Sequence, residues 1–226
     1  IQTFVDIFGF SVFLLMVGRL GRDELAATNI ASTINLLAFM PMIGFSLAVS
    51  TLVGQAVGRG RPAEGVAATR SALRLTCLYM WTLAALFLLA PGPLVEWFRP
   101  TGGGGESFAA VRGLSVTVLR FIAFYSVFDT LNVIYSGALR GAGDTAFIGW
   151  TIALLSVGLI VIPVTLGVTV FGAGILMAWT CVSAYVCLLA LVFRWRFRLG
   201  KWQRMRVIEA APAPVALVPP TGPGVE

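Results

Sequence analysis

Histidine is absent from this sequence of 226 residues, and only 12% of the residues are charged. Without histidine, the chain lacks a common zinc ligand and the side chain most often used for acid–base catalysis near neutral pH. The three cysteines do not follow the short spacings of metal sites, and the sequence has no Walker loop and no nucleophile beside a base. We therefore expect no enzymatic activity, no metal centre and no resident cofactor.

Apolar residues dominate the chain instead, at 58% of the sequence. Uncharged stretches cover residues 25–58, 75–95 and 145–193. A helix needs about 20 predominantly apolar residues to cross a bilayer, and the last stretch is long enough for two crossings. This composition predicts an all-α, polytopic membrane protein.

Six transmembrane helices account for the apolar segments. They are expected at about residues 1–18, 26–56, 67–98, 111–139, 146–167 and 173–197. Together they predict a six-helix transmembrane bundle over residues 1–209, followed by a proline-rich tail, residues 210–226, that is expected to be disordered. The first apolar segment contains an aspartate and lacks a basic leader, so we interpret it as part of a helix rather than a signal peptide and expect further chain upstream.

The basic residues indicate which helix ends face the cytoplasm, because short cytoplasmic loops are enriched in Lys and Arg. With six spans, the basic groups in residues 59–74, at Arg140 and in residues 194–206 fall on the same side. The opposite side has fewer basic residues, and acidic residues dilute them. We expect a multi-pass protein of a cell membrane, the bacterial inner membrane, with both ends of this chain in the cytoplasm.

The formal net charge of +6 is explained by this topology. Because the basic residues are scattered over membrane loops without an aromatic stacking platform, nucleic acid is not an expected partner. The segment 194–206 also carries Trp195, Phe197 and Trp202, which predicts an interfacial anchor in contact with the lipid bilayer.

Polar side chains recur on one face of the helix expected at residues 111–139. These residues, Tyr125, Asp129, Asn132 and Ser136, follow helical spacing. Ser, Asn and Tyr commonly hydrogen-bond between packed membrane helices, so a purely structural interpretation is open for Asn132 and Ser136. An ionised carboxylate inside a span costs about 2.5–3.5 kcal/mol or more. Asp129 is therefore predicted to face a hydrated cavity, to hold a cation or to carry a proton.

Asp6 lies in the first apolar segment, where no basic residue neutralises it. If Asp6 and Asp129 converge, the repulsion between the carboxylates and their desolvation favour uptake of a proton or a monovalent cation. Arg120 offers an alternative, since it precedes Asp129 by nine residues, roughly 13 Å along a helix. It either snorkels toward the headgroups or pairs with a carboxylate on another helix.

The helix expected at residues 26–56 carries Asn29 and Thr33 on one face, with Pro41 and Gly44 in mid-span. Proline removes a backbone hydrogen bond, so Pro41 and Gly44 form either a conformational hinge or a static kink that shapes packing. The candidate residues of a substrate pathway are Asn29, Thr33, Asn132 and Ser136.

Several spaced motifs resemble those of the multidrug and toxic compound extrusion (MATE) transporters. They lie at residues 25–30 (LAATNI), 39–44 (FMPMIG), 52–58 (LVGQAVG) and 137–145 (GALRGAGDT). The resemblance covers residues 1 to about 200, and the motifs follow the order found in the second half of such a transporter.

The resemblance implies a twelve-helix exporter with two six-helix lobes around a central cavity, driven by inward movement of Na⁺ or H⁺. This chain resembles the C-terminal lobe, so the N-terminal six-helix lobe of the same protein is an expected partner. Sodium-coupled relatives use an acidic residue in helix seven and a Tyr-x-x-x-Asp pattern in helix ten, and Asp6, Tyr125 and Asp129 match those positions. The helix-seven acid is often Glu in the family, and Asp6 departs from that pattern.

These expectations combine into a secondary active multidrug efflux antiporter that is coupled to Na⁺ or H⁺ at Asp6, Tyr125 and Asp129. Its substrates are expected to be amphipathic, often cationic, drug-like compounds. A flippase for lipid-linked saccharides or another amphiphile is the alternative from the same architecture. Such a flippase favours several basic residues in its cavity, whereas Arg120 is the only basic residue well inside a predicted span.

Overall fold

The computed structural model describes residues 2–99 and 105–204, and the side chains of residues 7–99 and 108–203. Those residues form helices joined by short turns, without a strand. The elements are α1 (Gln2–Leu20), α2 (Arg22–Gly58), α3 (Pro62–Leu89), α4 (Pro91–Glu96), α5 (Gly105–Gly141), α6 (Thr145–Ser156), the π-helix η1 (Val157–Val161), α7 (Ile162–Thr169), α8 (Ile175–Arg198) and the 3₁₀-helix η2 (Lys201–Arg204). The predicted tail, residues 210–226, lies outside the described residues.

Five helical segments in the described ranges are long and apolar enough to cross a membrane. They are Arg22–Gly58, Pro62–Leu89, Phe108–Gly141, Thr145–Thr169 and Ile175–Arg198. The sixth, α1, has 19 residues and is therefore roughly 28 Å long, close to the thickness of a hydrocarbon core. The fold class predicted from the sequence, an all-α membrane bundle, is confirmed.

The helix predicted at residues 67–98 is wrong in its last part, because α3 ends at Leu89 and the short α4 follows. Ala90 leaves the helical conformation with φ −132° and ψ 48°. Pro91 explains the break, since a proline disfavours the helical conformation in the residue before it. Pro163 has a different effect: the π-helix η1 precedes it and the chain continues into α7 without interruption.

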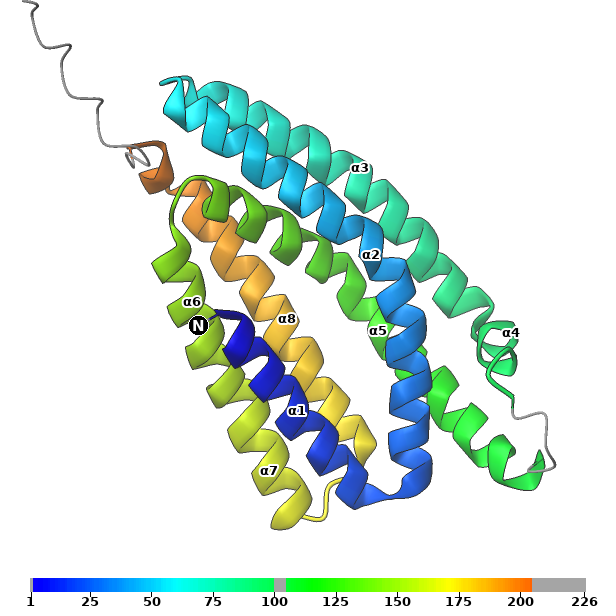
Figure 1. Ribbon diagram of the computed structural model, residues 1–226. Helices are drawn as coiled ribbons and strands as arrows, with labels where there is room; N and C mark the ends of the chain where they lie inside the picture. Colours follow the sequence, from blue (N-terminus) through cyan, green and yellow to red (C-terminus); the bar gives the residue numbers. More distant parts are fainter. Residues whose placement is uncertain (1, 100–104, 205–226) are drawn as a thin grey trace, which may run out of the picture.

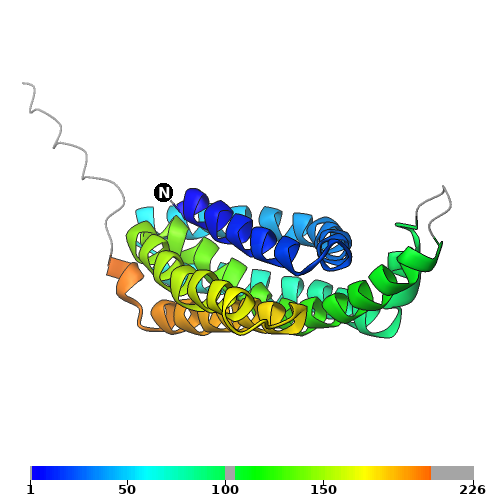
Figure 2. The same cartoon turned by 90° about the horizontal axis from the view of Figure 1, so that it is seen from below.

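The helix α5 lies at the centre of the bundle and packs against α2, α3 and α8 (Figure 1). The long helices α2 and α3 form an antiparallel pair, and α1 packs along α6 and α7. In the perpendicular view, α1 and α8 lie on opposite sides of the bundle over much of their length (Figure 2), and they meet where Phe13 of α1 contacts Trp179 of α8. Side chains on α5 can therefore contact side chains from most of the other helices.

The helices α2 and α5 approach closely because glycines on α5 face the backbone of α2. A Cβ atom on Gly137 would collide with the side chain and backbone of Ser46, and one on Gly141 would overlap the α2 backbone a turn further on. Ser46 uses this proximity to donate a hydrogen bond from Oγ to the carbonyl oxygen of Val133 at 3.1 Å. Small residues let membrane helices pack closely, so the last of the four sequence motifs has a packing role.

The connections that follow α2, α5 and α8 lie at the same end of the bundle (Figure 1). There an ion pair ties the turn after α5 to α8: Arg196 donates from Nε to Asp144 Oδ2 at 2.7 Å and from Nη2 to Oδ1 at 3.2 Å. The two side chains are only 16% and 7% exposed. The Arg196 guanidinium also lies over the Phe147 ring, 4.5 Å from its centroid. This bidentate pair fixes the turn against α8.

Two of the three aromatic residues expected to form an interfacial anchor lie inside the bundle. Trp202 is fully buried and stacks on Phe197 with the ring centroids 4.9 Å apart. Its Nε1 donates to the carbonyl oxygen of Phe197 at 2.9 Å. Trp195, by contrast, is 58% exposed. The predicted anchor is therefore wrong for Phe197 and Trp202, which close the core at this end of the bundle.

The helix α2 continues through Pro41 and bends in its middle (Figure 1). Proline cannot donate a helical hydrogen bond, and its ring displaces the preceding turn. From α3, the Tyr79 hydroxyl donates to the carbonyl oxygen of Ala38, three residues before Pro41, at 3.0 Å. Pro41 and Gly44 are both exposed, and the hinge function inferred from the sequence stays a prediction.

Candidate functional site

A cavity of about 340 Å³ opens between α1, α2 and α5. Tyr125 and Asp129 of α5 and Phe10 of α1 line it. The remaining lining residues all belong to α2 and are Asn29, Ser32, Thr33, Asn35, Leu36 and Phe39. The described side chains of the cavity therefore combine one carboxylate with hydroxyl groups, amide groups and aromatic rings.

Asp129 is the charged residue among the described side chains that line this cavity, and its own side chain is partly buried. Its Oδ1 accepts a hydrogen bond from Asn132 Nδ2 at 2.9 Å. Among the described side chains, no Arg or Lys forms an ion pair with Asp129. Arg120 is exposed and likewise has no acidic partner in that part of the chain. The cavity thus holds a carboxylate that no described basic side chain neutralises.

An aromatic cluster positions Tyr125, one helical turn before Asp129. Tyr125 is 7% exposed. Its ring stacks on Trp179 of α8, with centroids 6.5 Å apart and planes 11° from parallel. Phe13 of α1 meets the same tryptophan edge-on, with centroids 5.4 Å apart. Packing from two other helices therefore holds the tyrosine against the wall of the cavity.

The wall formed by α2 carries polar groups at helical spacing, because Asn29, Ser32, Thr33 and Leu36 recur on one face. The Thr33 hydroxyl donates to the carbonyl oxygen of Asn29 at 2.8 Å. Its hydrogen is therefore occupied, and the oxygen lone pairs are what Thr33 offers to the cavity. Side-chain oxygens from α2 and α5 thus face a common space.

This arrangement suits positively charged ligands. A hard cation takes oxygen ligands, and a carboxylate with neighbouring hydroxyl and amide oxygens supplies them. A proton is the alternative, because a carboxylate oxygen can also bind a proton. Phe10 and Phe39 add aromatic surface, on which organic cations are stabilised by the negative face of the ring.

The sequence of this chain matches the MatE family over residues 1–166. The match includes all the residues of α1, α2 and α5 that line the cavity. The chain belongs to the MatE family. The resemblance seen in the four sequence motifs is thereby confirmed.

Relatives of this MatE chain include proteins described as probable multidrug resistance protein NorM. The one from Pseudomonas putida is 32% identical over 206 residues, which are 87% of this chain and 43% of the relative. The one from Brucella suis is 31% identical over 88% of this chain and 42% of the relative, and the one from Thermotoga maritima is 28% identical over 91% and 44%. The chain spans less than half the length of the relatives that it matches.

Solved structures with the same fold include a MOP superfamily transporter from Pyrococcus furiosus. Its TM-score is 0.74 at 20% identity, over 90% of this chain and 44% of that chain. A MATE in a bent conformation gives 0.72 at 16% identity, over 89% of this chain and 44% of that chain. These structures show the MATE fold for this chain, again over about half of a longer protein.

Four of the site residues predicted from the sequence of this MatE chain line the same cavity. They are Asn29, Thr33, Tyr125 and Asp129. Asn132 does not line the cavity, but it reaches the site through its hydrogen bond to Asp129. Ser136 lies apart from the cavity, and its Oγ donates to the carbonyl oxygen of Val133 at 3.1 Å. The geometry of Ser136 favours the structural interpretation over a place in a substrate pathway.

Asp6 belongs to α1 and precedes the cavity residue Phe10 by one helical turn. Its side chain lies outside the described side chains. The convergence of Asp6 with Asp129, expected from the sequence, stays a prediction.

Sequence reasoning missed two polar residues of the cavity, Ser32 and Asn35. Ser32 follows Asn29 by three residues, so helical spacing was a sufficient signal for it. Asn35 is an amide within an apolar stretch, which is a weaker signal because amides also join packed helices. The stacking of Trp179 on Tyr125 had no sequence signal, since it depends on how α8 packs against α5.

Proposed function

We propose that this chain forms one six-helix lobe of a secondary active antiporter that exports amphipathic, often cationic compounds from the cell. The observation that carries the proposal is the cavity in which Asp129 faces the polar side of α2, where no described basic side chain pairs with it. The description of the relatives as multidrug resistance proteins supports efflux as the activity. A second lobe of similar size, on the open side of the cavity, is the proposed partner, since the relatives are more than twice as long as the matched region.

The lining of the cavity favours cationic cargo over anionic cargo. Asp129 is the charged group among the lining residues, and none of them is basic. An anionic lipid-linked saccharide would meet a carboxylate there and no arginine or lysine, which is unfavourable. The flippase considered from the sequence is therefore not supported by this cavity, whereas flat organic cations find both a carboxylate and aromatic rings.

The proposed coupling uses competition for one negative charge. When Na⁺ or H⁺ occupies the site of Asp129, Tyr125 and Asp6, the carboxylate is neutralised and a cationic substrate loses its counter-charge. Ion binding therefore promotes substrate release, and ion release restores the site. Such a cycle moves cargo in one direction only if the ion binds the outward-open and inward-open states unequally. The bend of α2 beside the cavity is the proposed element that differs between the two states.

We also propose that the end with η2 faces the cytoplasm of a bacterial cell, with the bundle in the inner membrane. The connection after α2, the connection after α5 and the C-terminal end of α8 all lie there (Figure 1). They carry most of the basic residues, which favours the cytoplasmic side.

Transport in proteoliposomes tests the function and identifies the coupling ion. The purified protein that carries this chain is reconstituted, and the movement of ethidium is followed by fluorescence while a Na⁺ gradient or a pH gradient is imposed. We expect ethidium to move against its own gradient when one of the two ion gradients is present. K⁺ in place of Na⁺, at the same ionic strength and pH, is the matched control. If ethidium movement is the same with and without each ion gradient, the proposed antiport is contradicted.

A further inference from the structure

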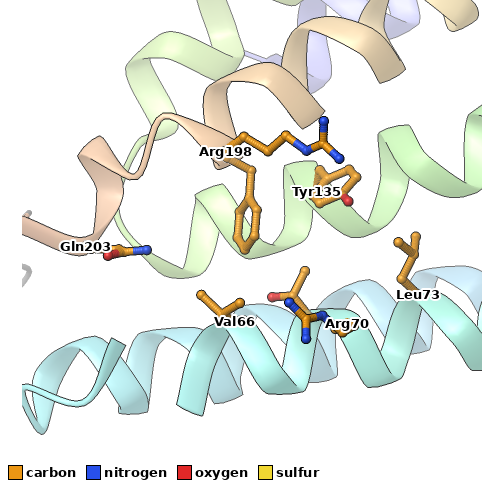
Figure 3. A pocket seen from close by; sticks show the side chains of 8 residues that line it. Val66, Arg70, Leu73, Tyr135, Arg198 and Gln203 are labelled. Atoms are coloured by element: carbon orange, nitrogen blue, oxygen red, sulfur yellow. The ribbon is translucent and has the colours of Figure 1, made fainter. Parts of the chain in front are cut away.

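A second cavity, of about 290 Å³, lies at the end of the bundle where the basic connections gather. Arg70 of α3 and Arg198 of α8 line it from opposite walls, and Tyr135 of α5 lies between them (Figure 3). Gln203 of η2 contributes an amide at one side. No acidic residue is among the described residues that line this cavity. This cavity is separate from the one that contains Asp129, and the two share no lining residue.

The positive charge of this second cavity is not compensated within the described chain. Neither Arg70 nor Arg198 forms an ion pair with an acidic side chain there. The two described acids at this end of the bundle, Glu64 and Asp144, already pair with other arginines. Two guanidinium groups in one concave site therefore lack an anion.

The donor groups fit a phosphate. Guanidinium groups recognise phosphate oxygens through paired N–H donors, and a phenol hydroxyl and an amide add further donors. A volume of 290 Å³ is about ten times the space that one water takes in the liquid, which is enough for a phosphodiester with its neighbouring carbons. Val66 and Leu73 supply apolar surface for those carbons.

The position along the helices points to a lipid as the source of the phosphate. On α3, the charged residues around Arg70 give way to the exposed leucines Leu75 and Leu78, which are 58% and 69% exposed. On α8, Trp195 is 58% exposed one turn before Arg198. Exposed tryptophan is typical of the headgroup level of a membrane, and exposed leucine is typical of the acyl-chain region. The cavity therefore lies at the depth of the phospholipid phosphates.

We propose that this cavity binds the phosphate of an anionic phospholipid such as phosphatidylglycerol through Arg70 and Arg198. The bound headgroup joins α3 to α8, two helices that otherwise pack mainly through α5 between them. Lipid binding at this site thus holds together the end of the bundle at which α5 and α8 are also tied by the Asp144–Arg196 ion pair.

Native mass spectrometry tests the proposal on the purified protein that carries this chain. The protein is titrated in detergent with phosphatidylglycerol or with phosphatidylcholine of the same chains, and the retained lipids are counted. We expect one phosphatidylglycerol molecule to bind more tightly than phosphatidylcholine. The double variant Arg70→Gln/Arg198→Gln is expected to weaken that binding by about thirtyfold, since each basic residue contributes roughly fivefold at a membrane surface.

Arg59→Gln is the matched control, because Arg59 is an exposed arginine at the same end that does not line the cavity. It is expected to leave the affinity unchanged. Equal affinity in the double variant, or an equal loss in Arg59→Gln, overturns the site. If inorganic phosphate at millimolar concentration displaces the lipid completely, a soluble phosphate compound is the ligand and the lipid assignment is overturned.

A second variant guards against loss of folding. Arg70→Lys/Arg198→Lys keeps both charges and removes the paired N–H geometry, so we expect an intermediate, several-fold loss of affinity. Circular dichroism establishes that the helices of each variant are intact. Unchanged affinity in the lysine variant would show that the arginine geometry is not used, and it would overturn the proposed mode of binding.

Discussion

Replacing Asp129 with asparagine removes the negative charge from the candidate cation site and changes little else. The side chain keeps its size, and the oxygen that accepts from Asn132 Nδ2 at 2.9 Å is still present. A hydrogen bond or contact to a charged group contributes about 1.5–3 kcal/mol. Its loss therefore corresponds to a weakening of cation binding by roughly 10- to 150-fold, and an amide in place of the carboxylate cannot take up the proton at all.

The same substitution is not expected to harm the fold. An amide costs less than a carboxylate to hold within a membrane bundle, and no described basic side chain loses a partner. We therefore expect Asp129→Asn to insert normally, with a thermal midpoint that is unchanged or higher. Loss of transport together with retained stability separates a functional carboxylate from a structural one.

The assay is the efflux of ethidium from cells that express the protein carrying this chain, with the amount of protein in the membrane measured in parallel. Glu64→Gln is the matched control, since it makes the same chemical change at an exposed carboxylate that only pairs with Arg61. We expect efflux to fall to background in Asp129→Asn and to stay normal in Glu64→Gln. Ion-dependent efflux at the normal rate in Asp129→Asn would refute the assignment.

Three further substitutions test the framework around the site. Asp144→Asn removes the counter-charge of the partly buried Arg196, so the free energy of unfolding should fall by about 1.5–3 kcal/mol, seen as a lower thermal midpoint. An unchanged midpoint would contradict the importance of the pair. Gly141→Val forces a side chain into the α2 backbone, so the variant should no longer give a monodisperse peak in size-exclusion chromatography. The control Gly149→Val, at a glycine with open space around it, should still give that peak. Tyr79→Phe removes the hydrogen bond to α2 before its proline, worth about 1 kcal/mol, and should change the rate of ethidium transport without changing the binding of ethidium; wild-type rates would argue against the hinge.

The membrane spans were predictable because they depend on a property that is local in sequence, the length of an uncharged apolar run. The break between α3 and α4 was also within reach, since Pro91 and the nearby Pro93 are visible in the sequence. The length of an apolar run by itself predicts one helix there, whereas a proline within the run ends that helix. Composition therefore predicts how many times the chain crosses more reliably than it predicts where each helix ends.

The site was only partly predictable, because spacing defines the face of one helix and not the helix that it meets. Helical spacing placed Tyr125 and Asp129 together, and it placed Asn29 and Thr33 together, but each pair was inferred alone. That the two faces share a cavity depends on the packing of α2 against α5. The same limit explains the error at Trp202, whose sequence context of basic residues suggests a membrane surface although its ring is buried.

Asp129 in α5 and Asp144 in the turn that follows α5 have different environments. Asp144 is buried, and Arg196 donates a hydrogen bond to each of its two carboxylate oxygens. Asp129 is partly buried and receives one hydrogen bond from a neutral amide. The fold therefore places an arginine against the carboxylate of Asp144, whereas no described arginine pairs with the carboxylate in the cavity. In the proposed antiporter, the counter-charge of Asp129 is a proton or a monovalent cation that arrives and leaves during transport, and the membrane position of the carboxylate supports that proposal.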